Sequence, residues 1–444
     1  MSEWPIKTIA ECASPEPYST QIGPFGKALM AKEYTVSGVP VLRGVNVNAG
    51  RFYDDGFVFI SEGKADELAK YESYPGDVLL VHKGTLGEIG LMPESRKHSR
   101  YIMGNSMMRV RCDRAKLLPE YLYYWLSSSD GQHYLFSRVS QVGVPQLQRP
   151  LTTLREAAFP VPPLPEQERI AHILGTLDDK IELNRRMNQT LEAIARAIFK
   201  SWFVDFDPVH AKAEGREPVG MDPETAALFP DSFQDSPLGK IPKGWDVKPF
   251  SEVVEVNPSR SLKKGEVAPY IDMASLPTVG AQLEGLPGSR AYKSGSRFRN
   301  GDVLFARITP CLENGKTVLV DFLSERAIGA GSTEFLVFGP GLAGTYFAYC
   351  ASRWTALREH AIASMTGTSG RQRAQKGAFD HFKMAVPEQK ILEAFETHVA
   401  PLFAAQRSAS QESRCLPGIR DTLLPHLLSG GLASQEELRG CIDA

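Results

Sequence analysis

The sequence has few cysteines, no long hydrophobic run and almost no excess of charge of either sign. Its six cysteines are scattered without a Cys-x-x-Cys pair, so neither a disulfide framework nor a structural zinc site is predicted. No apolar stretch approaches the ~20 residues needed to cross a bilayer, and no signal-peptide pattern opens the chain. We therefore expect a cytoplasmic protein with no membrane contact and no metal site.

The small net charge argues mildly against a nucleic-acid partner. The formal net charge is -2, whereas non-specific DNA binding depends on Lys and Arg side chains that neutralise phosphates. The objection weakens if basic residues gather on one face, or if partner subunits supply much of the phosphate contact. At 444 residues the chain is long enough for several domains, each with its own core.

The sequence does contain an internal repeat, and a repeat indicates the architecture more directly than any single motif. A Trp, a Lys and a Glu recur in register, as do a Gly-Asp turn before an apolar run, an aromatic helical stretch and a Pro-Glu-Gln triplet. The matched segments are residues 4–11 and 245–252, 76–80 and 301–305, 119–124 and 344–349, and 165–167 and 387–389. Matches in the same order predict two related modules with different loops, and loops carry specificity.

Each copy has the pattern of a globular domain followed by a long helix. Prolines up to Pro165 forbid a helix until Glu166 begins one. We predict an α+β protein in which two α/β domains are joined by two long antiparallel helices, a coiled-coil spacer with a pseudo-twofold internal repeat. The predicted parts are residues 1–162 (first domain), 163–206 (first spacer helix), 207–242 (linker), 243–385 (second domain) and 386–444 (second spacer helix and C-terminal segment).

The first long helix carries a heptad seam that should face the second helix. Its positions are Ile170, Leu174, Leu177, Ile181, Asn184, Asn188, Leu191, Ala195, Ile198 and Trp202. The two asparagines either fix the register by pairing across the interface or face solvent because the stripe drifts. The second helix carries Ile391, Phe395, Leu402 and Ala405 at matching spacing; Pro401 should kink it, and Pro417 should end or bend it again.

Two similar domains held apart by a rod suit a polymer with two sites at a fixed separation. DNA with two half-sites is the obvious case. Because the domains differ in their loops, the target should be asymmetric and bipartite.

Several segments resemble a known family. Residues 194–208, 212–216, 228–233 and 241–245 closely resemble the central region of type I restriction-modification specificity subunits. The helix start at 163–168 and residues 420–430 resemble the other segments that this family shares. The resemblance therefore spans the chain, although the globular parts are variable by nature.

This resemblance implies a non-catalytic, sequence-specific DNA-binding subunit with two target recognition domains, acting in defence against foreign DNA. Two adenine-N6 methyltransferase subunits would pack on its helices, and nuclease/translocase subunits would join them. S-adenosylmethionine, Mg²⁺ and ATP would belong to those partners, with no cofactor on this chain. The alternatives are a specificity subunit of a methylation-only or related complex, a single-chain DNA-modifying enzyme, and a coiled-coil adaptor that binds no nucleic acid.

Direct readout of double-stranded DNA needs Arg or Lys for guanine and Asn or Gln for adenine, supported by Ser and Thr. Two loops before the long helices, 141–149 and 366–373, have this chemistry, and the segments 82–84 and 307–309 are weaker candidates. Lys293, Arg297 and Arg299 could contact phosphates. The candidate DNA-binding residues are Lys83, Gln141, Gln146, Gln148, Arg149, Arg307, Thr366, Thr368, Ser369, Arg371, Gln372 and Arg373.

Three motifs with a superficial likeness to catalytic sites are interpreted as structural. Residues 257–260 lack the aromatic with which amino-methyltransferases grip a flipped base, and residues 84–90 fit neither glycine-rich nucleotide motif. Asp54, Asp55, Glu62 and Lys64 are typical of a strand-to-helix junction. We predict a turn at 257–260, a hairpin at 84–90 and no catalytic residue.

Overall fold

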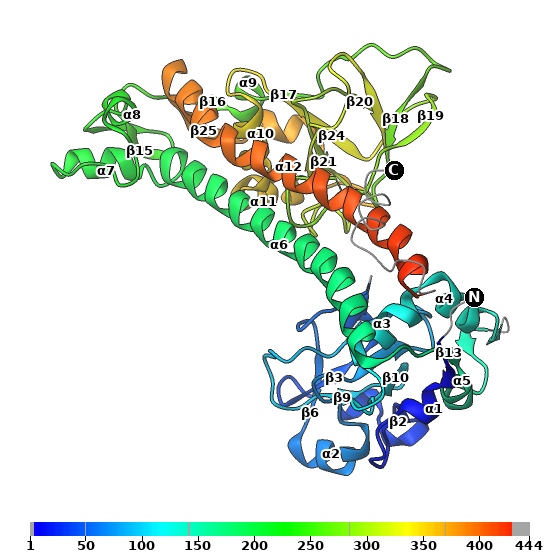
Figure 1. The fold of residues 1–444 in the computed structure, drawn as a ribbon. Helices are drawn as coiled ribbons and strands as arrows, with labels where there is room; N and C mark the ends of the chain where they lie inside the picture. The colour runs from blue at the N-terminus through cyan, green and yellow to red at the C-terminus, as the bar shows by residue number, and fades with distance from the viewer. Residues whose placement is uncertain (1–3, 49, 141–142, 284, 369, 429–444) are drawn as a thin grey trace. The chain divides into compact units, whose positions relative to one another are not determined.

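The chain forms two compact units in the computed structural model, which describes residues 4–48, 50–140, 143–283, 285–368 and 370–428 (Figure 1). The first unit comprises Met1–Asp179 and Cys415–Ala444, and the second comprises Lys180–Arg414. Both contain helices and sheets, so the predicted α+β class is confirmed. None of the described helices is both long and apolar enough to cross a membrane.

The first unit is built around a four-stranded sheet and a three-stranded sheet. The larger sheet has the order β2 (Thr20–Ile22), β10 (Met107–Val110), β7 (Val78–Val81), β8 (Ile89–Leu91), and the smaller has the order β6 (Val58–Ile60), β3 (Val39–Leu42), β9 (Ile102–Met103). The remaining elements are β1 (Ile6–Thr8), α1 (Ile9–Cys12), β4 (Val47–Asn48), β5 (Arg51–Phe52), α2 (Glu62–Glu67), α3 (Pro119–Ser127), α4 (Ser129–Phe136), β11 (Val139–Ser140), β12 (Gln146–Leu147), α5 (Pro150–Glu156) and β13 (Ala158–Pro160).

The second unit repeats the strand order of the larger sheet, and its other sheet has four strands where the first unit has three. Its larger sheet has the order β17 (Glu255–Val256), β24 (Phe335–Gly339), β21 (Val303–Ala306), β22 (Thr317–Leu319), and its other sheet has the order β19 (Gly288–Ala291), β18 (Val267–Ile271), β23 (Gly329–Gly331), β20 (Ser296–Phe298). It also contains β16 (Asp246–Pro249), α9 (Phe250–Val253), α10 (Thr345–Arg353), α11 (Thr355–Ala363) and β25 (Lys383–Val386). The repeated motifs therefore mark equivalent elements of one fold that occurs twice.

The first strand of each repeat pairs with the strand that precedes the long helix. Strand β1 is antiparallel to β13, and β16 is antiparallel to β25. The tryptophan before each first strand packs on the adjoining core, Trp4 partly buried and Trp245 buried. This explains why the opening motif recurs, because it closes each domain against the point where its long helix begins.

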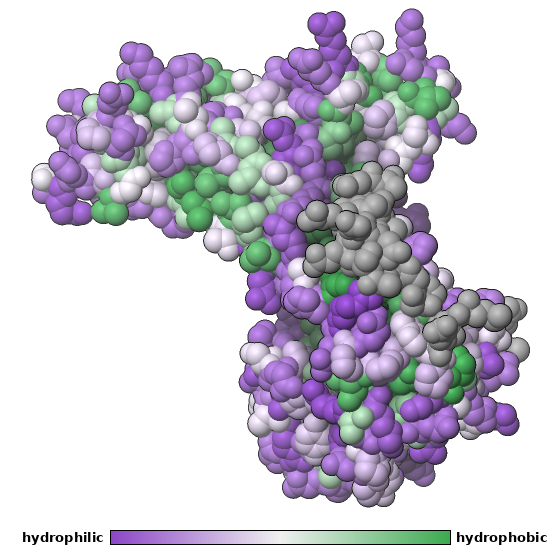
Figure 2. Space-filling model, in the orientation of Figure 1, coloured by the Kyte–Doolittle hydropathy of each residue, from purple (hydrophilic) through white to green (hydrophobic). Residues whose placement is uncertain are grey.

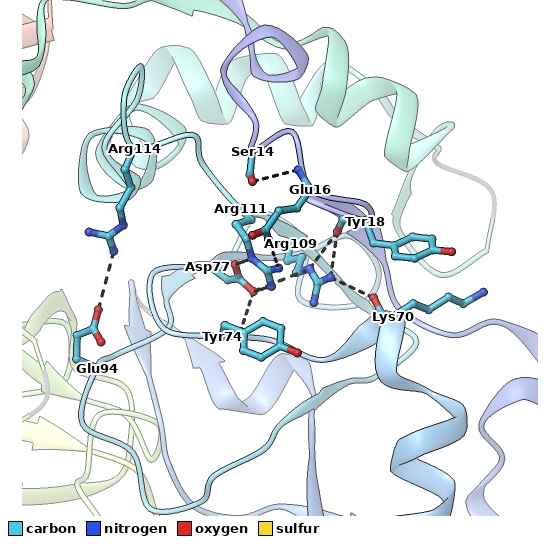
Figure 3. A network of polar contacts seen from close by, with 10 residues as sticks. All are labelled: Ser14, Glu16, Tyr18, Lys70, Tyr74, Asp77, Glu94, Arg109, Arg111 and Arg114. Atoms are coloured by element: carbon cyan, nitrogen blue, oxygen red, sulfur yellow. Dashed lines mark hydrogen bonds and ion pairs between the residues drawn. The ribbon is translucent and has the colours of Figure 1, made fainter.

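The Gly-Asp turn of each repeat holds a buried carboxylate that binds an arginine. Asp77 accepts two hydrogen bonds from Arg111, at 2.9 and 3.0 Å, and one from the backbone N–H of Tyr74 (Figure 3). Asp302 accepts the same set from Arg260 and from the backbone N–H of Arg299. Both carboxylates are fully buried, and an ionised group in such a place needs this pairing.

Helices α6 (Leu164–Phe203) and α12 (Gln389–Leu428) run antiparallel in each unit. In the first unit, Ile170 and Leu174 share a core with Leu423 and Leu427. In the second unit, Phe199 of α6 contacts Phe395 near the start of α12, whereas Asn188, earlier in α6, donates to Ser410, later in α12. Rising numbers on α6 therefore meet falling numbers on α12.

The predicted seam positions of α6 are all buried or half-buried. The structure separates the two interpretations of the asparagines. Asn184 is buried and its Nδ2 donates to Glu412 at 2.9 Å, to Ser413 and to the carbonyl of Ala409, while Asn188 donates to Ser410 at 2.8 Å. Both amides therefore pair across the helix interface rather than facing solvent.

The second long helix departs from the expected pattern in two ways. Helix α12 continues through Pro401 and Pro417, so of the two alternatives for Pro417, an end or a bend of the helix, the end is wrong. Ala405 is exposed and Leu402 is half-buried, whereas Val399 and Phe403 are buried in the core. The contacts of Phe403 with Tyr346 and Tyr349 show that packing on the second domain sets this face.

The segment 207–242, predicted as a linker, has structure of its own. It contains α7 (Asp207–Ala213), α8 (Pro223–Leu228) and the hairpin of β14 (Phe233–Ser236) and β15 (Gly239–Pro242). Val209, Phe229 and Ile241 are buried in the core of the second unit. The segment is therefore part of that unit.

Candidate nucleic-acid interface

In the first unit the two candidate segments lie side by side. Lys83, which follows β7, forms a β-bridge with Gln146 in the β11–β12 hairpin. Two backbone hydrogen bonds flank the bridge, from Gly84 N–H to Pro145 O at 3.1 Å and from Leu147 N–H to His82 O at 3.0 Å. These segments are more than fifty positions apart in the sequence, and the fold makes them neighbours.

This edge of the first unit exposes cationic and amide side chains. Lys83, Gln146, Gln148 and Arg149 are all exposed, and Arg149 adopts a left-handed backbone (φ 41°) directly before α5. Gln141 lies outside the described residues. Lys, Gln and Arg are the residue types that bind guanine, adenine and phosphates in DNA.

His82 points inward, unlike its neighbour Lys83. It is buried, its Nε2 lies 3.1 Å from the carbonyl oxygen of Asn105, and burial lowers its pKa. A lowered pKa favours the neutral imidazole near neutral pH. The segment 82–84 therefore offers Lys83, and not His82, to a ligand.

The second unit repeats the arrangement. Ile308, in the segment after β21, forms a β-bridge with Arg373. Thr309 N–H donates to Gln372 O at 3.0 Å, and Ala374 N–H donates to Arg307 O at 2.8 Å. The pairs 82–84 with 145–147 and 307–309 with 372–374 thus occupy equivalent places in the two folds.

The exposed side chains of the second unit differ from those of the first. Thr368, Arg371 and Gln372 are exposed, and Ser369 lies outside the described residues. Thr366 is exposed too, but its hydroxyl accepts a hydrogen bond from Gln375.

Arg373 differs from its neighbours because its guanidinium is held within the protein. It forms two 2.8 Å hydrogen bonds with Glu334, and this pairing raises the pKa of Arg373 and lowers that of Glu334. Arg373 is therefore placed to support the loop, and the sequence missed this because Glu334 is 39 positions away.

The basic residues around β20 separate into different places. Arg297 and Arg307 line one cavity, together with Ser259 and Thr333. The backbone of Arg299 instead bonds Asp302 at the opposite end of β21, and Lys293 lines a different cavity. Only spatial proximity to Arg307 distinguishes Arg297 from Arg299, so no local sequence signal could have done so.

The residues of the three motifs interpreted as structural form hydrogen bonds, ion pairs or strand connections within the protein. Asn257 has a left-handed backbone (φ 55°), accepts from Val337 N–H through its side chain, and precedes the Arg260 that binds Asp302. Residues 84–90 connect the antiparallel strands β7 and β8, which confirms the hairpin. Asp54 accepts from Tyr101, and Lys64 pairs with Glu33 and Glu67. Within the described ranges, no group of three or more His, Cys, Asp or Glu side chains is placed to hold a metal ion.

Comparison with known proteins finds similarity to one family. Residues 21–193 match the type I restriction modification DNA specificity domain. The sequence is 25% identical to the MjaIX type I restriction enzyme specificity subunit of Methanocaldococcus jannaschii, over 97% of this chain and 93% of that relative. The chain is therefore similar to type I specificity subunits over nearly its whole length and carries their DNA specificity domain at residues 21–193. It is also 24% identical to the HindI specificity subunit of Haemophilus influenzae, over 90% of this chain and 99% of the relative.

The fold agrees with this assignment. A type I restriction-modification S subunit from M. genitalium aligns with a TM-score of 0.51 at 15% identity, covering 96% of each chain. Type I specificity subunits recognise the DNA sequence for the restriction-modification complex and are not themselves catalytic. The functional residues should therefore be those that contact DNA and partner subunits.

Proposed function

We propose that this specificity subunit reads an asymmetric, bipartite target in double-stranded DNA, one half with each domain. The observation that carries the proposal is the equivalence of the bridged segments, Lys83 with Gln146 and Ile308 with Arg373. The same backbone frame occurs twice, but it exposes different polar side chains. Equivalent frames with unlike side chains suit half-sites of unlike sequence.

The exposed chemistry fits readout of base edges and phosphates. The first domain offers Lys83, Gln146, Gln148 and Arg149, and the second offers Thr368, Arg371 and Gln372. Arg and Lys bind guanine edges, and Gln binds adenine edges. Gathering these groups at two edges also answers the objection from the net charge of -2, because phosphates respond to local charge.

Partner docking belongs to the same proposal. Leu183, Met187 and Ile194 on α6 are 60%, 39% and 43% exposed, and their spacing places them on one helix face. Figure 2 shows apolar surface over the part of α6 in the second unit. We propose that adenine-N6 methyltransferase subunits, two per specificity subunit, cover the long helices. Nuclease/translocase subunits join that complex, and S-adenosylmethionine, Mg²⁺ and ATP are bound by the partners.

The experiment is to sequence the methylated sites made by the complex in cells. Gln146→Ala should relax the methylated motif in one half only, and Arg371→Ala should relax the other half only. Arg216→Ala is the control, because Arg216 is exposed, is ion-paired with Glu214, and lies in the segment 207–242, which contains none of the proposed DNA-reading residues. Equal loss of both halves, or no change in either, would contradict separate reading.

A second measurement tests the division of labour. The purified chain alone is incubated with DNA and labelled S-adenosylmethionine, and then again with the methyltransferase partner added. We expect methyl transfer only with the partner. Transfer by the chain alone would show that it is an enzyme, and absence of salt-dependent DNA binding with partners present would favour a protein-only adaptor.

A further inference from the structure

A basic cavity of about 450 Å³ opens beside the candidate interface of the second domain. It lies where β21 ends and β24 begins, and its basic residues are Arg297 and Arg307. Ser259 and Thr333 add hydroxyl groups to its wall. The cavity adjoins the reading loop, because Arg307 pairs through its backbone with Glu334 and Ala374.

The two arginines give the cavity positive charge. Glu334 interacts electrostatically with Arg307, but its two carboxylate oxygens are engaged by the bidentate contact with Arg373. Within the described ranges neither Arg297 nor Arg307 forms an ion pair, and the Nε of Arg307 is buried without a hydrogen-bond partner. A buried guanidinium N–H without an acceptor is costly, so a ligand acceptor at this place would be stabilising.

The wall opposite the arginines is held in a fixed shape. Asn257 turns the chain through its left-handed backbone and accepts from Val337 N–H, which places Pro258 and Ser259 at the cavity. Arg260 then fixes the far side of this turn by binding the buried Asp302. The shape therefore does not depend on a ligand to form it.

We propose that this cavity binds a backbone phosphate of the DNA half-site read by the second domain. The inference rests on the proposed function and assigns Arg297 and Arg307 to positioning, whereas Arg371 and Gln372 read bases. Guanidinium groups with hydroxyl groups suit a phosphodiester, which offers several acceptor oxygens and one negative charge.

The first domain differs at the position equivalent to Arg307. The position after β7 that corresponds to Arg307 is occupied by His82, which is buried and bonded to Asn105. The proposal therefore predicts that the second domain contributes a sequence-independent anchor that the first domain lacks.

The test is the salt dependence of DNA binding by the full complex with its methyltransferase partner. Arg307→Ala and Arg297→Ala should each weaken binding roughly tenfold for cognate and non-cognate DNA alike. Loss of one phosphate contact should also reduce the slope of log affinity against log salt by about 0.9. The methylated motif should stay unchanged.

Controls separate the outcomes. Arg326→Ala removes an exposed arginine from the loop that bonds Asn300 at the opposite end of β21, and it should leave the slope unchanged. Thermal unfolding of each variant would detect misfolding, and Arg307→Gln is a second, more conservative variant that removes the same charge.

Each possible outcome decides between the two proposals. An unchanged slope in both variants, or a motif that becomes degenerate in one half, would overturn the phosphate site. If the wild-type complex shows no salt-dependent binding at all, the proposed function itself fails, which is a different result.

Discussion

The carboxylate of Glu396 makes the stability of the second unit depend on pH. Glu396 projects from α12 and accepts hydrogen bonds from the backbone N–H groups of Phe347 at 2.7 Å and Tyr346 at 3.2 Å, at the start of α10. Burial raises its pKa from 4.5 to about 6, although these hydrogen bonds oppose the rise. The folded state therefore binds this proton more tightly than the unfolded state does.

The sign and size of the effect follow from that shift. Below pH 4.5 both states are protonated and the stabilisation is fully present; it is lost as pH rises through about 6. A shift from 4.5 to about 6 corresponds to roughly 2 kcal/mol in total, of which about 1 kcal/mol falls between pH 5 and 7.5. Glu396→Gln removes the titration and retains an acceptor oxygen for one N–H group.

The assay is urea unfolding of the full chain followed by tryptophan fluorescence, since Trp202, Trp245 and Trp354 lie in the second unit. The stability of Glu396→Gln relative to the wild type should rise by about 1 kcal/mol from pH 5 to 7.5. Parallel pH profiles for the two proteins would refute the reasoning, because any effect of the substitution on packing alone is independent of pH. Glu393→Gln, at an exposed site one turn earlier, is the matched control.

Three further outcomes are expected. Asn184→Ala should lower the free energy of unfolding by about 1–3 kcal/mol in urea titrations, because it removes the hydrogen bonds of Asn184 to Ala409, Glu412 and Ser413 across the helix interface; an unchanged value would show that the pairing contributes nothing. Asp302→Ala should cost about 3–5 kcal/mol by leaving Arg260 unpaired, against little change for Asp246→Ala, whose side chain is 74% exposed; similar losses would refute the role of burial. Leu183→Glu with Met187→Glu should abolish co-elution with the methyltransferase subunit, whereas Leu228→Glu should not; retained co-elution would place the docking surface elsewhere.

The repeat, the helix starts and the seam of the first helix could be predicted because their signals are local. Helix α6 begins at Leu164, two residues before the predicted start at Glu166, because Pro165 is tolerated in a first helical turn; heptad spacing follows from helix geometry alone. The equivalence of the candidate segments 82–84 and 307–309 could also be predicted, since each follows a recognisable strand; that they read DNA stays a prediction. What the sequence could not show was that Lys83 and Gln146 would meet across one bridge.

The errors arose where tertiary contacts decide. Helix α12 tolerates Pro417 because its neighbours Leu423 and Leu427 pack in the core of the first unit, and tertiary packing can offset one lost backbone bond. The face of α12 at Phe403 is set by stacking on Tyr346, which no helical period in α12 records. Arg373 is held by Glu334, whose position relative to it depends on the sheet.

The two buried aspartates show what the repeated fold requires and what it leaves free. Each accepts the backbone N–H three residues earlier, from Tyr74 or Arg299, so the turn itself demands the carboxylate. The arginine that neutralises it comes from a different strand in each copy, Arg111 after β10 and Arg260 after β17. The fold therefore requires an arginine to balance the buried carboxylate, but it does not require that the arginine come from one particular strand.

The same separation explains how the two copies can differ in their reading segments. The Gly-Asp turns lie at the beginning of β7 and β21, whereas the segments proposed to read DNA begin where these strands end. Substitutions at Lys83 or Ile308 therefore do not disturb the buried carboxylates, because the length of a strand lies between them. A fold with its ion pair at one end of a strand and its variable segments at the other can acquire new specificity without losing its framework.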